Sequence, residues 1–260
     1  MFLMKPLLIS VLCLASATTL LAGVVSKNGR LQTDGNQIVG DHGNPVAVHG
    51  MSHFWSQWEG VFYTAETVDW LVKDWHATLA RAFLGVHDGE LGYQQQPARE
   101  IAKIKRFVDA AIANDIYVLI DWHDHHAEDN IKDAVAFFSQ MAKTYGDQPH
   151  IIYEIYNEPL KISWSKTVKP YAERVIAAIR RHDPDNLIVV GTPYWSQRVD
   201  EAAADPIDDA NVAYVLHFYA VSHKADLRQR AQKALDMGVA LMVTEWGTME
   251  ASGDGGIDRE

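Results

Sequence analysis

The feature that most constrains the fold is the alternation of short apolar runs with longer amphipathic segments. Seven runs rich in apolar and β-branched residues predict strands over 46–51, 79–86, 116–121, 151–156, 187–191, 212–217 and 239–244. The segments between them carry apolar residues at helical spacing, as in Ile101, Ile104 and Val108 behind Pro97. Because strand–helix alternation builds parallel βαβ units, the sequence predicts an α/β fold.

Two architectures fit this pattern. A closed (β/α)8 barrel, or TIM barrel, needs an eighth strand, but after 239–244 the chain continues through the polar segment 251–256 and ends at Glu260. The sheet is therefore either open and doubly wound, or a TIM barrel truncated before its eighth strand. Polar residues at the strand ends favour the barrel, because barrel strand ends converge on one face. A seven-stranded barrel has two unpaired edges, so we expect it to fold poorly or to dimerise by edge pairing.

Two local patterns complete the fold prediction. Turn signals within 31–48 predict a small hairpin that covers the base of the domain. Thr64 is the predicted N-cap of a helix with Val68, Leu71, Val72 and Trp75 on one face.

The N-terminus has the pattern of an export signal. Lys5 precedes an apolar run over 7–21, and cleavage after Ala17 or Ala22 fits the small residues there. The run is short for a transmembrane helix. We therefore expect a signal peptide over residues 1–22 and secretion from a bacterium.

The mature chain, 23–260, is expected to be one domain without cysteine, because the only cysteine, Cys13, lies in the predicted signal. This excludes a disulfide scaffold and a cysteine-ligated metal site. The formal net charge of −11 argues against nucleic acid or an anionic membrane as a partner and favours a neutral substrate. Eight Trp and ten Tyr offer faces on which sugar rings stack, although most aromatic residues serve the core.

Polar side chains end almost every predicted strand. They are Arg81, His123, Asn157, Glu158, Trp195, His217, Tyr219 and Glu245. Glu158 and Glu245 are the informative pair, because glycoside hydrolysis needs one protonated and one ionised carboxyl group. A separation of about 5 Å implies retention of configuration and about 6.5–9.5 Å implies inversion. The sequence leaves that distance open.

Two of these features have alternative interpretations. Arg81 lies in an apolar run, where it either pairs structurally with Glu154 or holds a catalytic carboxylate ionised. The cluster His123, His125 and His126 lies among acidic residues and could suggest a metal-dependent hydrolase. Its spacing matches no defined ligand motif, so we predict a solvated loop and neither a metal nor a cofactor.

Five segments together resemble a known family. They are Leu79-Ala80-Arg81-Ala82, Ile120-Asp121-Trp122-His123, Tyr153-Glu154-Ile155-Tyr156-Asn157-Glu158-Pro159, Leu216-His217-Phe218-Tyr219 and Thr244-Glu245-Trp246-Gly247. In this order they resemble the family-5 glycoside hydrolases of clan A, close to bacterial secreted endo-β-1,4-glucanases (cellulases). The resemblance covers nearly everything after the signal segment and implies a β-glucan substrate.

The resemblance also implies roles for individual residues. Glu158 would be the acid/base and Glu245 the nucleophile of a retaining double displacement, and Asn157 would hold the sugar 2-hydroxyl group. The remaining positions are substrate-site residues: Arg81 and Tyr219 beside Glu245, His217 near the acid/base, His123 lining the sugar site, and Trp55 and Trp195 as aromatic platforms. The family's eighth strand carries a further Trp, for which this chain has no counterpart.

Three related activities and a non-catalytic binding role stay open at this stage. The same scaffold supports mannanase, lichenase and xyloglucanase activities, because the fold and the acid pair do not determine the sugar. A non-catalytic glucan-binding protein is favoured by the missing strand and disfavoured by the intact acid pair. A carbohydrate-binding module beyond residue 260 would be compatible with either.

Overall fold

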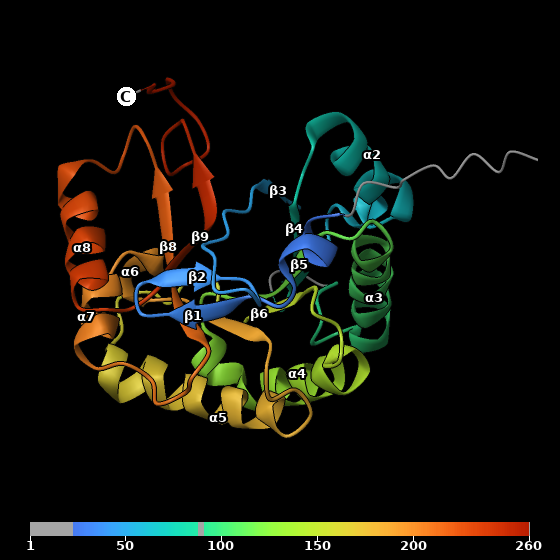
Figure 1. Ribbon diagram of the computed structural model, residues 1–260, viewed down its shortest axis with the longest axis horizontal. Coiled ribbons are helices and arrows are strands. Elements are labelled where there is room, and N and C mark those ends of the chain that lie inside the picture. The colour runs from blue at the N-terminus through green and yellow to red at the C-terminus, as the bar shows by residue number, and fades with distance from the viewer. Residues whose placement is uncertain (1–22, 88–90, 260) are drawn as a thin grey trace, which may run out of the picture.

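The computed structural model describes residues 23–87 and 91–259, which form a parallel sheet of seven strands ringed by helices (Figure 1). The strands are β3 (Gly50–Ser52), β4 (Leu79–Gly85), β5 (Tyr117–His123), β6 (Ile151–Glu154), β7 (Leu187–Val190), β8 (Val212–Tyr219) and β9 (Leu241–Gly247). They lie side by side in chain order. A doubly wound sheet reverses its strand order at a switch point, so this order excludes that alternative and confirms the predicted barrel class.

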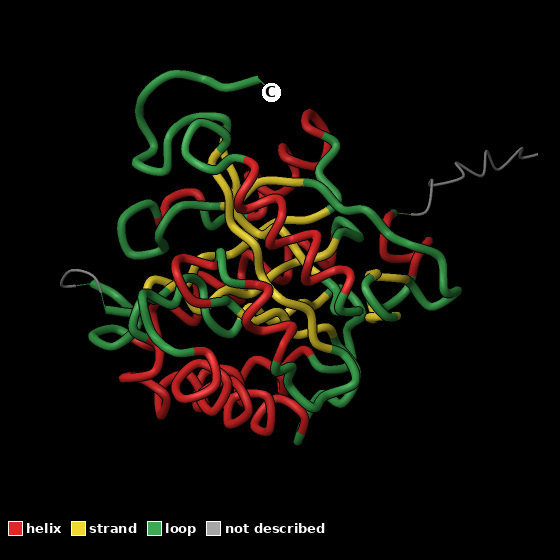
Figure 2. The backbone as a smooth tube through the Cα atoms, turned by 90° about the vertical axis from the view of Figure 1, so that its left-hand side faces the viewer, coloured by secondary structure: helices red, strands yellow, loops and turns green. Residues whose placement is uncertain are grey.

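Helices connect successive strands and cover the outside of the sheet (Figures 1 and 2). The longer ones are α2 (Ala65–Trp75), α3 (Pro97–Ala113), α4 (Ile131–Tyr145), α5 (Lys169–Arg180), α7 (Val199–Ala204) and α8 (Ala225–Asp236). Short turns of helix are α1 (Val24–Asn28), η1 (Gly60–Phe62), η2 (Ala127–Asn130), η3 (Trp164–Val168) and α6 (Pro193–Ser196). The sequence pattern did not predict these short turns, because they contain too few residues for a periodic signal.

The ring of helices is open on one side, between α8 and α2 (Figure 1). In the part of the chain that the structure describes, β3 pairs only with β4 and β9 only with β8. A cavity of about 540 Å³ lies between these two edges, lined by β3 and β9 and reaching Arg81. We call β3, β9 and this cavity the open wall, and β4 with β5 the closed wall.

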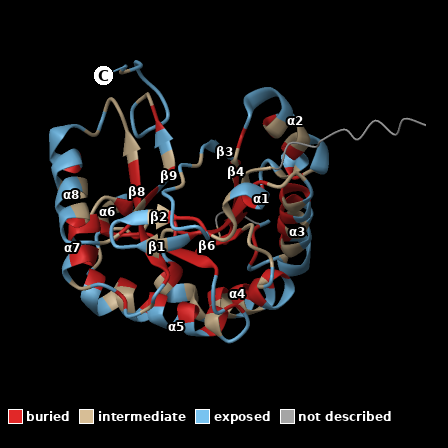
Figure 3. Cartoon of the chain, in the orientation of Figure 1, coloured by how far each residue is buried: buried red, intermediate tan, exposed pale blue. Residues whose placement is uncertain are grey.

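Strand parity separates the two layers of the core. Leu79, Leu119, Ile152 and Val189 belong to a cluster inside the barrel, whereas their strand neighbours, such as Ile120, pack outward against the helices. Figure 3 shows the central strands and the inner faces of the helices buried, with the outer helix faces and much of β9 exposed. The same inward parity places polar side chains in the next layer towards the strand ends.

The predicted start of the helix at 65 is confirmed, but the last residue of its apolar face is not buried. The Thr64 hydroxyl accepts a hydrogen bond from the Thr67 backbone N–H, as an N-cap does. Val68 and Leu71 are buried, whereas Trp75 is 54% exposed. Because α2 flanks the open wall, no described helix packs beside that face (Figure 1).

The predicted strand over 46–51 is too long, and its register explains why. Gly50 pairs with Leu79, the first residue of β4, so the residues before Gly50 have no strand to pair with. At the other end, β5 and β9 extend beyond their predicted ends, because their neighbours continue to pair with them at His123 and Gly247.

The predicted hairpin forms at the base, from β1 (Gln32–Asp34) and β2 (Gln37–Val39). The Asn211 side chain bridges the hairpin to the start of β8, by donating to the Leu31 carbonyl and accepting from the Thr33 N–H. The predicted signal peptide, 1–22, lies outside the described residues. No helix within 23–87 and 91–259 is long and apolar enough to cross a membrane.

Candidate active site

Arg81 is the centre of a buried ionic layer at the mouth of the barrel. Its Nε donates to Glu154 at 2.6 Å, and its Nη2 lies 3.1 Å from Asp121. Its Nη1 lies 3.0 Å from Glu245. Burial lowers the pKa of Arg81, but the three carboxylates outweigh it and raise the pKa above the ordinary value. Arg81 therefore does both things that its sequence position left open: it pairs with Glu154 and contacts Glu245.

A β-bulge allows two adjacent residues of β9 to face this layer. Leu216 pairs with Val243 and His217 pairs with Glu245, so Thr244 is an extra residue without a partner in β8. The Thr244 hydroxyl donates to Glu154 Oε1 at 2.6 Å, while Glu245 contacts Arg81. Regular alternation would point these two side chains to opposite faces of the sheet.

The surroundings of Glu245 favour its ionised carboxylate form. The Tyr219 hydroxyl donates to its Oε1 at 2.6 Å, and Arg81 donates to its Oε2 at 3.0 Å. Burial raises the pKa of Glu245, but the positive charges of His217 and Arg81 more than offset it, and the net pKa is lowered. The pKa of Tyr219 is raised by burial and by Glu245, so its hydroxyl keeps the proton that it donates.

Glu158 faces Glu245 and is held by two histidines. His217 Nδ1 lies 2.8 Å from its Oε1, and His125 Nε2 lies 3.1 Å from its Oε2. One carboxylate oxygen of Glu158, one of Glu245 and a ring nitrogen of His217 all lie within 4.8 Å of one another. Burial raises the pKa of Glu158, but the hydrogen bonds from His125 and His217 lower it well below its usual range.

Asn157 links the two sides of the site. Its Oδ1 accepts from Arg81 Nη2 at 2.6 Å, and its Nδ2 lies 3.4 Å from His123 Nε2. Its backbone N–H bonds the Trp122 carbonyl, which continues the β5–β6 ladder just past the end of β6. Asn157 thus reaches the ionic layer although regular pairing ends at Glu154.

The predicted solvated loop is wrong for His123. This side chain is 4% exposed, stacks on the Phe83 ring at 3.8 Å and contacts Asp121 through Nδ1 at 2.7 Å. Burial and then Arg81 lower its pKa to about 3, so the imidazole is neutral near pH 7. The Trp55 ring lies edge-on to it at 4.4 Å, which brings this predicted platform next to the site.

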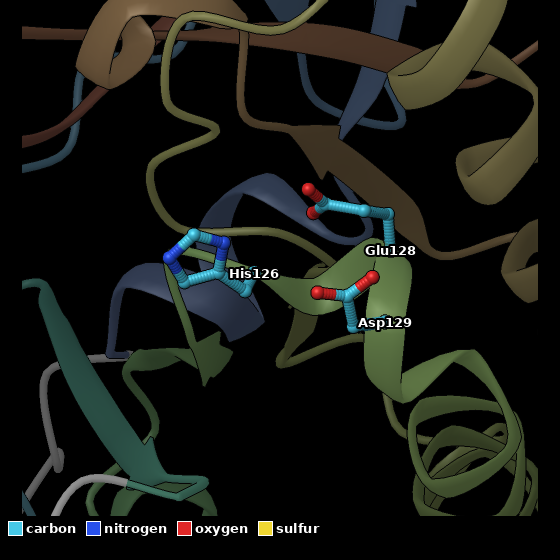
Figure 4. Close-up of side chains that lie close together, drawn as sticks. All are labelled: His126, Glu128 and Asp129. Carbon is cyan, nitrogen blue, oxygen red and sulfur yellow. The ribbon is translucent and has the colours of Figure 1, made fainter.

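The three histidines of the 123–126 segment diverge instead of forming one metal site. His123 points into the ionic layer and His125 to Glu158, whereas His126 is exposed. His126, Glu128 and Asp129 gather on the turn that contains η2 (Figure 4), with ligand atoms within 4.8 Å of one another. Of the three histidines, His126 is therefore the one that, with Glu128 and Asp129, could bind a cation. This triad shares no residue with the group that contains Glu158 and Glu245.

Trp195 lies in an unusual backbone segment beside the site. Tyr194, Trp195 and Ser196 all have φ values between 55° and 58°, the left-handed region that non-glycine residues rarely adopt. Hydrogen bonds from the Tyr194 and Trp195 N–H groups to the carbonyls of Leu160 and Pro159 hold this turn in place. It lines a cavity of about 540 Å³ together with Glu158, His217, Tyr219 and Glu245. Strain of this kind is often stored at functional sites.

Sequence reasoning missed three contributors to the site. His125 stood in the sequence as one member of the histidine cluster, and Tyr194 as the neighbour of Trp195. Thr244 was part of the Thr-Glu-Trp-Gly segment, but no role followed from its position. The only available signal was proximity in sequence to a predicted site residue, because the bulge and the left-handed turn leave no periodic pattern.

Comparison with known proteins gives consistent matches. The family model described as Cellulase (glycosyl hydrolase family 5) matches residues 39–260. Endoglucanase Z of Dickeya dadantii is 55% identical over 233 residues, which are 88% of this chain and 54% of that protein. Endoglucanase A of Evansella cellulosilytica is 45% identical over 220 residues. The chain spans about half the length of these curated relatives.

Solved structures agree with the fold. A structure from Cytophaga hutchinsonii matches with a TM-score of 0.88 and 54% identity, and covers 90% of this chain and 76% of that one. The catalytic domain of endoglucanase Cel5A from Thermobifida fusca matches with a TM-score of 0.84 and 35% identity over 90% of this chain and 79% of that one. The family match covers most of the sequence, and the chain belongs to glycosyl hydrolase family 5.

Proposed function

We propose that this protein is an endo-acting β-1,4-glucanase that hydrolyses cellulose with retention of configuration. The observation that carries the proposal is that one carboxylate oxygen of Glu158 and one of Glu245 lie within 4.8 Å of each other. This closeness supports retention, for which the two carboxyl groups lie about 5–5.5 Å apart, over inversion, for which they lie about 6.5–9.5 Å apart.

In the first step, Glu245 attacks the anomeric carbon while Glu158 donates a proton to the leaving glycosidic oxygen. Arg81 and Tyr219 support this role of Glu245, because their hydrogen bonds keep the nucleophile ionised and aimed. The product is a covalent glycosyl-enzyme. In the second step, Glu158 removes a proton from the water that hydrolyses it.

The remaining site residues would bind the sugar. Asn157, oriented by Arg81, would hold the 2-hydroxyl group, a bond that strengthens in the oxocarbenium-like transition state. His123, His217, Trp55 and Trp195 would line the cleft. Support for a β-glucan comes from a variant of the Thermobifida fusca enzyme solved in complex with cellotetraose, and the net charge of −11 suits a neutral polymer.

The test is reducing-sugar release from carboxymethylcellulose by the wild type and by Glu158→Gln and Glu245→Gln. We expect each substitution to lower the rate by about 10²–10⁴-fold, whereas Glu173→Gln on the exposed face of α5 serves as a matched control without effect. EDTA should leave activity unchanged. Proton NMR of a cellooligosaccharide digest should show the β-anomer first.

Three outcomes would count against the proposal. Release of the α-anomer first would rule out the double displacement, and loss of activity with EDTA would favour a metal-dependent hydrolase. Binding to cellulose without any hydrolysis would favour a glucan-binding protein, an alternative supported by the open wall beside Glu245. Parallel assays on mannan, lichenan and xyloglucan would rank the related activities.

Secretion and self-association are part of the same proposal. The pattern over residues 1–22 supports export through a cleaved signal, which N-terminal sequencing of secreted protein would test at Ala17 and Ala22. The unpaired edges of β3 and β9 support an edge-mediated dimer. Analytical ultracentrifugation showing a monodisperse monomer would overturn the dimer.

A further inference from the structure

The two histidines that hold Glu158 differ in their surroundings. The His217 side chain is 2% exposed and that of His125 is 32% exposed. They contact different oxygens of the carboxylate, His217 at Oε1 and His125 at Oε2. His217 is therefore buried, whereas His125 is partly exposed to solvent.

The tautomer of His217 follows from the hydrogen bonds behind it. Glu154 is fully buried but has a lowered pKa, because the charges of Arg81 and His217 outweigh its burial, so it is an ionised acceptor. Thr244 has one hydroxyl proton and gives it to Glu154 at 2.6 Å. The Thr244 oxygen, 2.8 Å from His217 Nε2, must then accept a hydrogen bond from the N–H of that nitrogen.

With Nε2 protonated, one proton is shared between His217 Nδ1 and Glu158 Oε1. It sits either on the imidazole, facing a carboxylate, or on the carboxyl group, facing a neutral imidazole. Burial lowers the pKa of His217, but the bonds to Glu154 and Glu158 outweigh it and raise the pKa to about 9. The pair holds a proton at neutral pH between a His217 side chain that is 2% exposed and a Glu158 side chain that is 13% exposed.

His125 occupies the side where exchange with water is open. Its Nε2 lies 3.1 Å from Glu158 Oε2. Its ring centroid lies 6.4 Å from the rings of both Trp55 and His123, and the Tyr156 hydroxyl lies 3.1 Å from its carbonyl oxygen. The loop is thus held by Tyr156, which lies just past the end of β6, and the imidazole lies near two aromatic rings and against the carboxylate.

We propose that His125 is a positioning residue that holds the Glu158 carboxylate and exchanges the catalytic proton with solvent. The inference rests on the proposed function of Glu158 as the acid/base. The imidazolium gives its Nε2 proton to Glu158 Oε2, which leaves a neutral imidazole and a carboxylic acid. In the free enzyme a hydronium ion or a buffer acid then returns a proton to the imidazole, and water or the buffer base is left.

Several charged or titratable groups face this pair. Glu158 is faced by His125 and by His217, Tyr219, His223 and Glu245 from β8, β9 and the loop after β8. His125 is faced by His123 and Glu158, with Asp124, His126 and Glu128 on its own loop. Among them, His125 and His217 form hydrogen bonds with the two oxygens of the Glu158 carboxylate.

The sign of the effect follows from these contacts. A donor at Oε2 favours the carboxylate form, so removing His125 raises the pKa of Glu158. The alkaline limb of the kcat/KM profile, where the acid loses its proton, then moves to higher pH. The plateau falls at the same time, because the carboxyl group is held on one side only.

The experiment compares the wild type with His125→Met, which removes the donor, and His125→Gln, which keeps a neutral one. The substrates are phenyl β-cellobioside, whose leaving group needs a proton, and dinitrophenyl β-cellobioside, whose leaving group does not. For His125→Met we expect kcat/KM on the phenyl substrate to fall about tenfold or more, and the alkaline limb to move up. The dinitrophenyl substrate should change less than about twofold, and His125→Gln should lie between wild type and His125→Met.

The matched control is His126→Gln on the exposed neighbouring side chain, which should leave both substrates and the limb unchanged. An equal loss on both substrates with an unmoved limb would reduce His125 to a structural role. A readout without activity is the NMR titration of the His125 ring, whose midpoint should fall in Glu158→Gln. An unchanged midpoint contradicts the pairing, whereas a wild type that cleaves neither substrate contradicts the proposed function instead.

Discussion

The closed wall and the open wall differ in how far their strands are paired and buried. β4 and β5 pair over seven residues each, and every one of these residues is buried. β3 pairs over three residues, all exposed, and β9 alternates between buried and exposed positions. The comparison teaches that a strand is buried by its neighbours and not by its composition alone. Arg81 on the closed wall meets Glu245 on the open wall, so the site depends on both.

The largest loss of stability is expected from a substitution of Arg81, which connects the two walls. Arg81→Met leaves Asp121 and Glu154 buried without their cation, so we expect unfolding to cost about 3–5 kcal/mol less than in the wild type. Urea unfolding followed by tryptophan fluorescence measures this. The control Arg228→Met, on the exposed face of α8, should change stability by less than about 0.5 kcal/mol. A loss below about 1 kcal/mol for Arg81→Met would mean that the layer tolerates unpaired carboxylates.

A pair of apolar truncations tests the walls directly. Leu119 on β5 is completely buried, whereas Val243 on β9 is 39% exposed. Leu119→Ala should destabilise the protein by about 3 kcal/mol through lost burial and a cavity, and Val243→Ala by less than about 1 kcal/mol. Equal losses in urea unfolding would show that the open edge of β9 is covered in solution, as in the proposed dimer.

The pH dependence of stability should report the site between the walls. Because the folded pKa of His217, about 9, lies above the ordinary 6.5, its contribution is complete below pH 6.5 and is lost as pH rises through 9. At about 1.4 kcal/mol per pKa unit the loss is at most about 3–4 kcal/mol. Urea unfolding at pH 6 and 9.5 should show this fall for the wild type and not for His217→Gln. NMR titration of the ring gives the same answer if the variant folds poorly.

The smallest effect is expected at the helix beside the open wall. Thr64→Ala removes the N-cap of α2 and should lower stability by about 1 kcal/mol. Thermal unfolding measures the shift, and Thr64→Ser should restore most of it because the hydroxyl is kept. No change for Thr64→Ala would show that α2 contributes little to the cooperative unit.

Most of the fold was predictable because it rests on short-range periodicity. The seven strands, their order and the helices between them follow from apolar spacing. Errors arose where tertiary neighbours decide the outcome, as at residues 46–49, which have no strand to pair with, and at Trp75, whose face of α2 is uncovered.

The acid pair was likewise predictable, because Glu158 and Glu245 each stand where an apolar run ends. Their partners were less so. His125 meets Glu158 across 33 positions and Thr244 meets Glu154 across 90. Neither contact has a local pattern that would predict it.

The sequence by itself determined that the chain forms parallel βαβ units with carboxylates at the strand ends, because strand and helix periods are local properties of the residues. Only the tertiary structure decided which side chains meet. The bulge at Thr244 turns two consecutive residues towards the ionic layer, and the left-handed turn at Trp195 places an aromatic ring beside Glu158. The physical reason for both the bulge and the left-handed turn is that hydrogen bonds from distant strands and loops outweigh local backbone preference.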